Sequence, residues 1–350
     1  ESALYRALCF LVISCPCAIA ISVPLSYFSG IGRASREGIL IKGSDYLELL
    51  GNINEIIFDK TGTITTGEFS NYELNILDKT YSEEEIINYY VLGENLSNHP
   101  LAKSIVKLFP KKDSKKIINF EEISGSGIKY ELDNHLIKIG NSNFCHSKDD
   151  NHAIYLNIDN NNVASLLLYD GIKKDSKETI RKLKELGIIT KMFTGDKENI
   201  AKTIAKKVGI DQVYSELLPD DKFRLLEEEI KNNNQVAFAG DGINDAPSLA
   251  MATIGISMGG VGSASAIEAS DVVIMTDELS KITKGINVSK FTNKIIKENL
   301  VFAIGIKILV LILSFLGIAS MWQAVFADTG VTLITIINTT RIFKKKDFDK

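Results

Sequence analysis

The stretch Ile56-Ile57-Phe58-Asp59-Lys60-Thr61-Gly62-Thr63 decides the fold of this 350-residue chain. Its three consecutive apolar residues predict a short buried β-strand, and Asp59 stands at the carboxyl end, where open α/β sheets place their chemistry. The Thr61-Gly62-Thr63 turn offers backbone N–H groups and hydroxyls to the oxygens of a phosphoryl group. Asp59 is therefore a candidate nucleophile, which would divide phosphoryl transfer into two steps through an aspartyl-phosphate.

Three later segments supply the other groups that phosphoryl transfer from a nucleotide needs. Thr194, in Thr194-Gly195-Asp196 after an apolar strand at 188–193, can hold the moving phosphoryl group, and the ammonium of Lys222 can neutralise its charge. Asp241, in Gly240-Asp241-Gly242-Ile243-Asn244-Asp245 after a strand at 235–239, can bind Mg²⁺ beside Asp59, because Mg²⁺ prefers carboxylates, phosphate oxygens and water. Each segment alone is typical of a polar turn that caps a helix, but the four in this order predict one phosphoryl-transfer site.

DKTGT, TGD and GDGINDAP resemble, in this order, the motifs of the phosphorylation domain of P-type ATPases. The resemblance implies an α/β, haloacid-dehalogenase-like (Rossmann-type) domain in which ATP phosphorylates Asp59. It also implies that Asp59, Asp241 and the main-chain carbonyl of Thr61 hold Mg²⁺. The other catalytic residues that it implies are Thr194, Gly195, Asp196, Lys222, Asn244 and Asp245.

Thr61 stands two residues after the nucleophile, where related phosphatases carry a second acid that protonates leaving groups and helps to activate water. Without that acid the phosphoenzyme is expected to hydrolyse slowly. A transporter needs such a delay.

Long apolar stretches lie near both ends of the sequence. Residues 4–31 and 299–320 are each long enough to cross a hydrocarbon core of about 30 Å, and 322–342 is a third, shorter and more polar candidate. Lys and Arg flank their inner ends, so the positive-inside rule places residues 36–297 in the cytoplasm. These features predict a multi-pass protein of the cell membrane, the alternative being core helices of a soluble protein. The net charge of −4 gives no argument for nucleic-acid binding.

Cys15-Pro16-Cys17 lies in the middle of the first apolar stretch. Pro16 lacks a backbone N–H and should disturb the helix, turning both thiols toward one site. Two thiolates suit Cu⁺, Zn²⁺, Cd²⁺ or Pb²⁺, and a disulfide between residues two apart is not expected. Asp328 could complete the ligand set, with Lys307 as its counter-charge when no metal is bound. The alternative is a purely structural Lys–Asp pair.

Cys-Pro-Cys followed by Ser22 and Pro24 is similar to the fourth membrane helix of heavy-metal P-type ATPases. Lys307 and Asp328-Thr329-Gly330 resemble the zinc, cadmium and lead exporters among them, and the motifs typical of copper exporters have no counterpart here. The resemblance therefore implies ATP-driven export of Zn²⁺, Cd²⁺ or Pb²⁺. Three alternatives are a Cu⁺ exporter, a soluble aspartate-nucleophile phosphatase and a non-catalytic metal sensor. Cys9 and Cys145 fall outside the motif, and Cys145 is expected in a soluble loop.

Residues 69–166 read as an inserted α+β domain with helices at 82–93 and 100–109, the first opened by a Ser82–Glu85 capping box. Six residues match the nucleotide-binding domain of heavy-metal P-type ATPases: Glu94, His99, Gly125, Gly127, Gly140 and Asn141. The resemblance implies that Glu94 and His99 hold the adenine end of ATP, while the glycines let the backbone approach the nucleotide.

The expected domains are a membrane helix at 1–35, a phosphorylation domain at 36–68 and 167–290, the insertion at 69–166 and two membrane helices at 291–343. The resemblance covers only the later half of a pump. The actuator domain, the earlier helices and any N-terminal metal-binding domain are expected outside this chain, which alone should not transport. Thr66-Gly67-Glu68 spells the actuator motif, but it follows the nucleophile too closely and is assigned no catalytic role.

Overall fold

The computed structural model describes residues 10–12, 14–110, 117–147, 153–232, 235–241, 245–259, 264–318, 320–345 and 348. Contacts divide the chain into two compact units. The first contains the residues up to Ile64 and from Lys173 onward, and the second is Thr65–Ile172. The insertion was predicted at 69–166.

A seven-stranded sheet forms the centre of the first unit, with the strand order β1-β13-β12-β11-β2-β9-β10. Neighbouring strands are parallel except β1 and β13. Strands β2 and β11 are buried along their whole length, as parallel strands covered on both faces are. The strands are β1 (Ile39–Ile41), β2 (Glu55–Asp59), β9 (Ile189–Phe193), β10 (Gln212–Tyr214), β11 (Val236–Gly240), β12 (Ile254–Met258) and β13 (Val272–Ile274). The strands predicted around Ile57, at 188–193 and at 235–239 are confirmed.

The strand order reverses between β2 and β11. From β2 the chain builds β9 and β10 on one side, and then β11, β12 and β13 on the other. Such a reversal leaves a crevice at the carboxyl ends of the two central strands, where open α/β sheets bind ligands. Asp59 ends β2 and Asp241 directly follows β11, so the topology alone brings these two carboxylates together.

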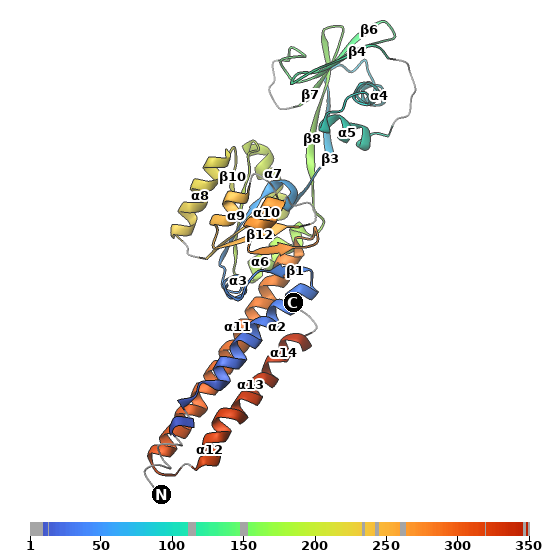
Figure 1. Cartoon of the computed structure of the whole chain (residues 1–350). Coiled ribbons are helices and arrows are strands. Elements are labelled where there is room, and N and C mark those ends of the chain that lie inside the picture. The colour runs from blue at the N-terminus through green and yellow to red at the C-terminus, as the bar shows by residue number, and fades with distance from the viewer. Residues whose placement is uncertain are drawn as a thin grey trace. The chain divides into compact units, whose positions relative to one another are not determined.

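Short helices cover this sheet (Figure 1). Helices α8, α9 and α10 pack on the face that carries Ile57, Phe193 and Phe238. The helices around the sheet are α3 (Ser44–Leu50), α6 (Ser176–Glu185), α7 (Glu198–Val208), α8 (Pro219–Asn232), α9 (Ala246–Met251) and α10 (Ala264–Ala269), with the turn η1 (Lys60–Ile64) after β2.

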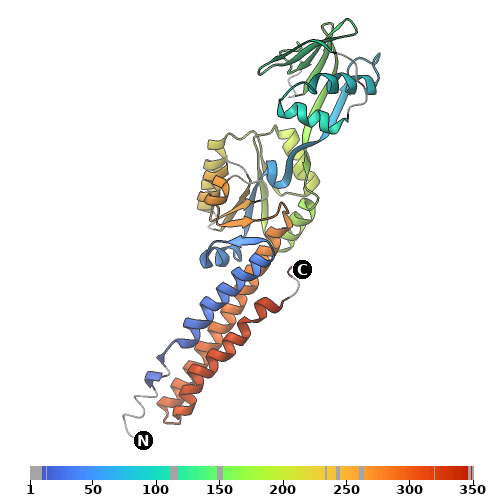
Figure 2. The ribbon, with the colours of Figure 1, turned by 45° about the vertical axis from the view of Figure 1, so that its right-hand side comes forward.

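Long helices complete the first unit, and Figures 1 and 2 show them side by side. They are α2 (Cys17–Arg36), α11 (Ser280–Phe315) and a run of consecutive helical elements, α12 (Met321–Val325), η3 (Phe326–Gly330), α13 (Val331–Thr339) and α14 (Arg341–Lys344). Among the described residues, Phe10–Arg36 and Ser280–Phe315 are long and apolar enough to cross a membrane. Their outward faces expose large apolar side chains such as Phe28, Val301 and Ile308, which fits a lipid environment.

The second predicted span differs from the structure in its length. The second is the carboxyl-terminal part of one 36-residue helix, α11. Its amino-terminal turns bury Ile282, Ile286 and Val288 and contact α3 and α6, which makes this helix longer than a membrane span. The third predicted span is continuously helical from Met321 to Thr339, with the π-helical segment η3 around Asp328 in its middle. Of the first, residues 4–9 and 13 lie outside the described residues.

The second unit is a six-stranded antiparallel sheet in the order β3-β8-β7-β6-β5-β4. The strands are β3 (Thr65–Ile76), β4 (Ile118–Ile123), β5 (Gly127–Leu132), β6 (His135–Gly140), β7 (Ile154–Ile158) and β8 (Asn161–Ile172). Helices α4 (Glu83–Glu94) and α5 (Pro100–Leu108) pack against this sheet around the fully buried Tyr130 and Ile139. The predicted Ser82–Glu85 capping box is confirmed.

Candidate functional site

Asp59 lies buried at the end of β2 between a backbone N–H and an ammonium group. The N–H of Thr61 donates to Asp59 Oδ2 at 3.0 Å, and Lys222 Nζ, on α8, donates to Asp59 Oδ1 at 2.5 Å. Lys222 also lies 3.3 Å from Asp245 Oδ1. The structure thus places the predicted nucleophile and the predicted cation in direct contact.

Three carboxylates meet at this point. Oxygens of Asp59, Asp241 and Asp245 all lie within 4.8 Å of one another. Burial, together with the charge of Asp245, raises the pKa of Asp59 to about 6. Burial, together with the charge of Asp59, raises the pKa of Asp241 to about 6. Carboxyl groups this close to one another repel when they are ionised, and a hard divalent cation bound between them would stabilise the ionised forms. These residues therefore fit Mg²⁺.

The turn after Asp59 packs closely against Asp241 and is hydrogen-bonded to Lys173, which follows the second unit in the sequence. Gly62 has a φ of +70°, and a Cβ at this position would collide with the Asp241 carboxylate. Lys173, whose side chain is 3% exposed, donates from Nζ to the main-chain oxygen of Gly62 at 2.7 Å and contacts Asp277 Oδ1 at 2.6 Å. These contacts hold the loop in one position.

Thr194-Gly195-Asp196 follows the neighbouring strand β9. Thr194 is buried, and its hydroxyl accepts from the N–H of Asp196 at 3.1 Å. The carboxylate of Asp196 is 2.8 Å from Lys60 Nζ, so this segment is tied to the Asp59 turn. Asn244 lies outside the described residues.

Sequence reasoning did not identify Lys60, Lys173 or Asp277 as part of this site. Their partners are 104 to 136 positions away in the chain, as in the Lys173–Asp277 and Lys60–Asp196 pairs. Two features of the sequence could have pointed to these lysines. Lys60 directly follows Asp59, and Lys173 stands where the chain returns from the second unit to the first.

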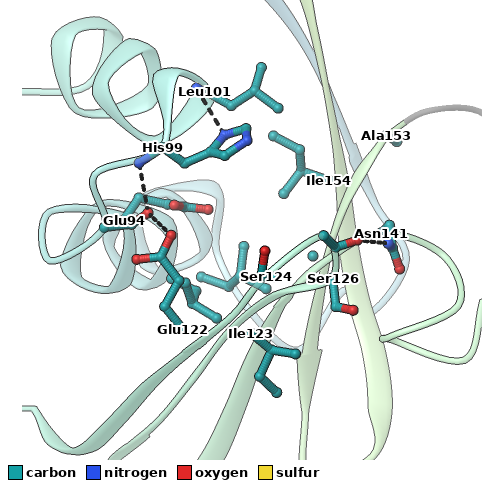
Figure 3. Close-up of a pocket in the computed structure, with 16 residues that line it drawn as sticks. Glu94, His99, Leu101, Glu122, Ile123, Ser124, Ser126, Asn141, Ala153 and Ile154 are labelled. Atoms are coloured by element: carbon teal, nitrogen blue, oxygen red, sulfur yellow. Dashed lines mark hydrogen bonds between the residues drawn. The ribbon is translucent and has the colours of Figure 1, made fainter.

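The six residues predicted to bind nucleotide all line one cavity of about 620 Å³ in the second unit (Figure 3). His99 caps α5, and its Nδ1 accepts from the N–H of Leu101 at 3.3 Å. The side-chain amide of Asn141 donates to the Gly125 oxygen at 3.0 Å, which fixes the glycine turn. Ser97 and Glu122 also line this cavity and were not predicted.

The three glycines of this cavity differ in how closely they are packed. Gly127 and Gly140 face each other across β5 and β6, and a Cβ on either would collide with the backbone of the other strand or turn. Only Gly125, with a φ of +72° and open space around it, leaves backbone free to approach a ligand. Strand packing by itself requires glycine at Gly127 and Gly140, and the prediction that all three glycines let the backbone approach the nucleotide stays a prediction.

A second cluster lies between the long helices. The sulfurs of Cys15 and Cys17 and a carboxylate oxygen of Asp328 lie within 4.8 Å of one another. Pro16 interrupts the helix as predicted, and α2 begins at Cys17. Lys307 Nζ donates to the main-chain oxygen of Cys15 and lies 3.7 Å from Asp328 Oδ1.

The structure pairs Cys15 and Cys17 as a disulfide. This corrects the expectation of two separate thiolates. The break at Pro16 directs both sulfurs to one point, and reduction of the pair would leave two soft ligands there.

Two remaining expectations concern single residues. Cys145 is in a loop of the second unit, as expected, and it is fully buried there. Thr66 and Glu68 lie at the start of β3, where Glu68 pairs with Lys107 at 2.5 Å. Cys9 lies outside the described residues.

Comparison with known proteins identifies a matching family and relatives of this chain. A family model described as haloacid dehalogenase-like hydrolase matches residues 53–253. The chain is 42% identical to the cadmium, zinc and cobalt-transporting ATPase of Bacillus subtilis, covering 98% of this chain and 51% of that protein. It is 42% identical to the zinc-transporting ATPase of Synechocystis sp., covering 97% and 49%. The chain therefore spans about half the length of the curated relatives that it matches.

Solved structures agree with these relatives. A zinc-transporting PIB-type ATPase in its E2.Pi state superposes with a TM-score of 0.85 at 30% identity, covering 97% of this chain and 58% of that one. The catalytic domain of a CPx-ATPase superposes with a TM-score of 0.60 at 30% identity, covering 74% of this chain and 98% of that one.

Proposed function

The chain belongs to the haloacid dehalogenase-like hydrolases and, within them, to the heavy-metal-transporting P-type ATPases, and from this premise we propose that it drives export of Zn²⁺, Cd²⁺ or Pb²⁺ with ATP. One observation carries the proposal. The same chain holds a buried Asp59 against Lys222 and a Cys15–Cys17–Asp328 group against Lys307. A soluble phosphatase would need only the first of these sites. A metal sensor would need only the second.

Phosphoryl transfer begins with the Asp59 carboxylate. One of its oxygens attacks the γ-phosphorus of ATP, the bond to the β,γ-bridging oxygen breaks, and ADP leaves. Lys222 keeps Asp59 ionised and neutralises charge on the phosphoryl oxygens, while Thr194 offers its hydroxyl to them. Mg²⁺, held by Asp59, Asp241 and the Thr61 carbonyl, would supply further neutralisation of the phosphate oxygens.

Hydrolysis of the aspartyl-phosphate is the second step. Thr61 is exposed, and its hydroxyl is neither a general acid nor a general base at neutral pH, so Thr61 offers an attacking water no proton acceptor. The phosphoenzyme should therefore persist until another part of the pump assists, which gives the membrane site time to change its access.

The membrane site binds the transported ion through reduced Cys15 and Cys17 together with Asp328. A thiolate–thiolate–carboxylate set suits Zn²⁺ and Cd²⁺, and it lacks the additional soft ligand that would favour Cu⁺. Lys307 at 3.7 Å from Asp328 replaces the charge of the ion when the site is empty. The long apolar helices support a location in the cell membrane, and the proposal has the ATP-using units in the cytoplasm.

Transport by the full-length protein tests this function. Inside-out vesicles should accumulate Zn²⁺ and Cd²⁺ when ATP is supplied, and Cys15→Ala or Cys17→Ala should abolish the uptake. Cys145→Ala is the matched control, because Cys145 lies in the second unit, away from the metal ligands. Uptake of Cu⁺ alone would overturn the assignment of the ion. Uptake that needs neither cysteine would overturn the metal site.

A further inference from the structure

Lys191 is a buried cation inside the α/β part of the first unit. It lies on β9 in register with Ile57 of β2, and its side chain is 7% exposed. Its Nζ lies 3.1 Å from Glu55 Oε1 and 2.6 Å from Glu229 Oε1. Both carboxyl groups are largely buried as well, and the Tyr214 hydroxyl donates to Glu229 Oε1 at 3.4 Å. One ammonium group is therefore shared by two acidic side chains in the interior.

These three side chains belong to the three elements that carry the groups for phosphoryl transfer. Lys191 is on β9, which leads into Thr194. Glu55 opens β2, the strand that ends at the nucleophile. Glu229 is on α8, the helix that carries Lys222. The ammonium of Lys191 thus links two catalytic strands to the catalytic helix at a point away from the reacting atoms.

Helix α8 directs Lys222 and Glu229 to the same side. They stand seven positions apart, which is close to two full turns of an α-helix, so the two side chains leave the helix in nearly the same direction. Leu226, between them, is fully buried in the apolar core on this face of the sheet. The helix is therefore held at two polar points along one line, where Lys222 contacts Asp59 and Glu229 contacts Lys191.

A buried ion pair at this place does something that apolar packing would not do. Removal of charges from water is costly, and well-packed apolar side chains often stabilise a fold as well as a buried ion pair does. Apolar contacts are non-directional, however, whereas a short pair of charges fixes the two elements in one register. Register matters here, because a shift of α8 by about 1 Å would displace the Lys222 ammonium from the Asp59 carboxylate, and misplacements of that size can slow a reaction strongly.

We propose that Lys191 is a positioning residue for phosphoryl transfer. Through Glu229 it fixes the place of α8 along the sheet, and so it sets the ammonium of Lys222 against Asp59. Glu55 holds Lys191 from the other side, which extends the link to the strand that ends at the nucleophile. This inference rests on the proposed function, because it concerns the step in which Asp59 attacks ATP.

Single-turnover phosphorylation of the full-length protein tests the proposal. Mixing with γ-labelled ATP, Mg²⁺ and Zn²⁺, followed by an acid quench, gives a rate constant and a labelled fraction. Glu229→Gln removes the charge that α8 offers to Lys191, so the rate constant should fall about fivefold while the dissociation constant of ATP stays unchanged. The matched control is Glu227→Gln, which loses only an exposed pair with Lys231 on the same helix and should keep the rate. The labelled fraction reports the amount of folded protein separately.

A double variant shows whether the effect passes through Lys222. In protein that carries Lys222→Met the helix has no ammonium to place, so adding Glu229→Gln should slow phosphorylation by less than about twofold. A merely structural role would slow both proteins by the same factor. Lys191→Met removes the same link from the strand and should lower the rate constant as Glu229→Gln does.

Two results would overturn the inference. One is equal slowing by Glu229→Gln with and without Lys222, and the other is a rate in Glu229→Gln equal to that in Glu227→Gln. If the unchanged protein formed phosphoenzyme on Asp59 in either case, only this inference would fail. Absence of phosphoenzyme in the unchanged protein would instead contradict the proposed function.

Discussion

The site around Asp59 and the cavity around Glu94 both crowd carboxyl groups, but they balance the charge in different ways. Lys222 lies 2.5 Å from Asp59, and Lys173 holds the adjoining turn through the Gly62 oxygen. The described lining of the Glu94 cavity contains no lysine or arginine. The first site is balanced by fixed cations, whereas in the second, burial and the charge of Glu122 raise the pKa of Glu94 to about 7.

The difference follows from what each site has to bind. A phosphoryl site needs an ionised nucleophile and must attract a polyanion, so fixed positive charge and a divalent cation serve it. We propose that the cavity of the second unit binds the uncharged base of the nucleotide, which needs no fixed cation.

Removal of Lys222 should give the largest effect. Lys222→Met leaves Asp59 and Asp245 without their shared ammonium, so the rate of phosphoenzyme formation should fall about a hundredfold or more. The pH at which that rate is half-maximal should rise, because the pKa of Asp59 loses the lysine that lowers it. Arg224→Met, two residues along the same helix and exposed, is the control. A rate of phosphoenzyme formation equal to that of Arg224→Met would contradict the role of Lys222 as the fixed cation of this site.

Lys173 should matter less, because it positions the turn and does not touch Asp59. Lys173→Met should slow phosphorylation about tenfold and leave the dissociation constant of ATP unchanged, since the cavity proposed to bind nucleotide is in the other unit. The neighbouring, exposed Lys174→Met is the matched control. Asp277→Asn still accepts a hydrogen bond from Lys173, so its effect should be smaller. A weaker ATP affinity in Lys173→Met would contradict this role.

The stability of the fold around the Glu94 cavity should depend on how closely the backbone is packed at each glycine. Gly127→Ala places a methyl group against the backbone of β6 and should cost several kcal/mol of stability. Gly125→Ala meets open space and pays only for its φ of +72°, about 1 kcal/mol. Denaturant unfolding of the two variants measures this contrast. Equal costs would mean that the interpretation of the glycines is wrong.

The pH dependence of stability should give the smallest effect. The pKa values of Asp59 and Asp241 are about 6 in the folded chain, above those of unfolded aspartates. The folded state therefore binds more protons between about pH 4 and 6, and stability without Mg²⁺ should fall as the pH rises through this range. Asp241→Asn should raise the melting temperature at pH 7 by a few degrees and reduce its response to Mg²⁺. A lower melting temperature in this variant would contradict the account.

Much of the Asp59 site could be predicted because its residues follow strands in short motifs. The apolar run before Asp59, and the runs before Thr194 and Asp241, each predict a buried strand. Parallel strands then deliver those three residues to one edge of the sheet. The residues that support them could not be predicted in this way, since Lys173 finds Asp277 only after the sheet has formed.

The cavity and the spans show the same limit. Glu122 and Ser97 carry no motif, and their bond is visible only when β4 lies beside the loop before α5. The length of α11 depends on Ile282 and Ile286, whose burial against the α/β unit extends the helix beyond a membrane span. Hydropathy alone does not report that packing.

Phosphorylation of Asp59 in response to metal is the most direct test of the central claim. The full-length protein, incubated with γ-labelled ATP, Mg²⁺ and Zn²⁺ under reducing conditions, should acquire an acid-stable label that hydroxylamine removes. The label should map to Asp59, disappear in Asp59→Asn, and lose its dependence on Zn²⁺ in Cys15→Ala. A label that persists in Asp59→Asn, or that forms equally with and without Zn²⁺, would contradict the account.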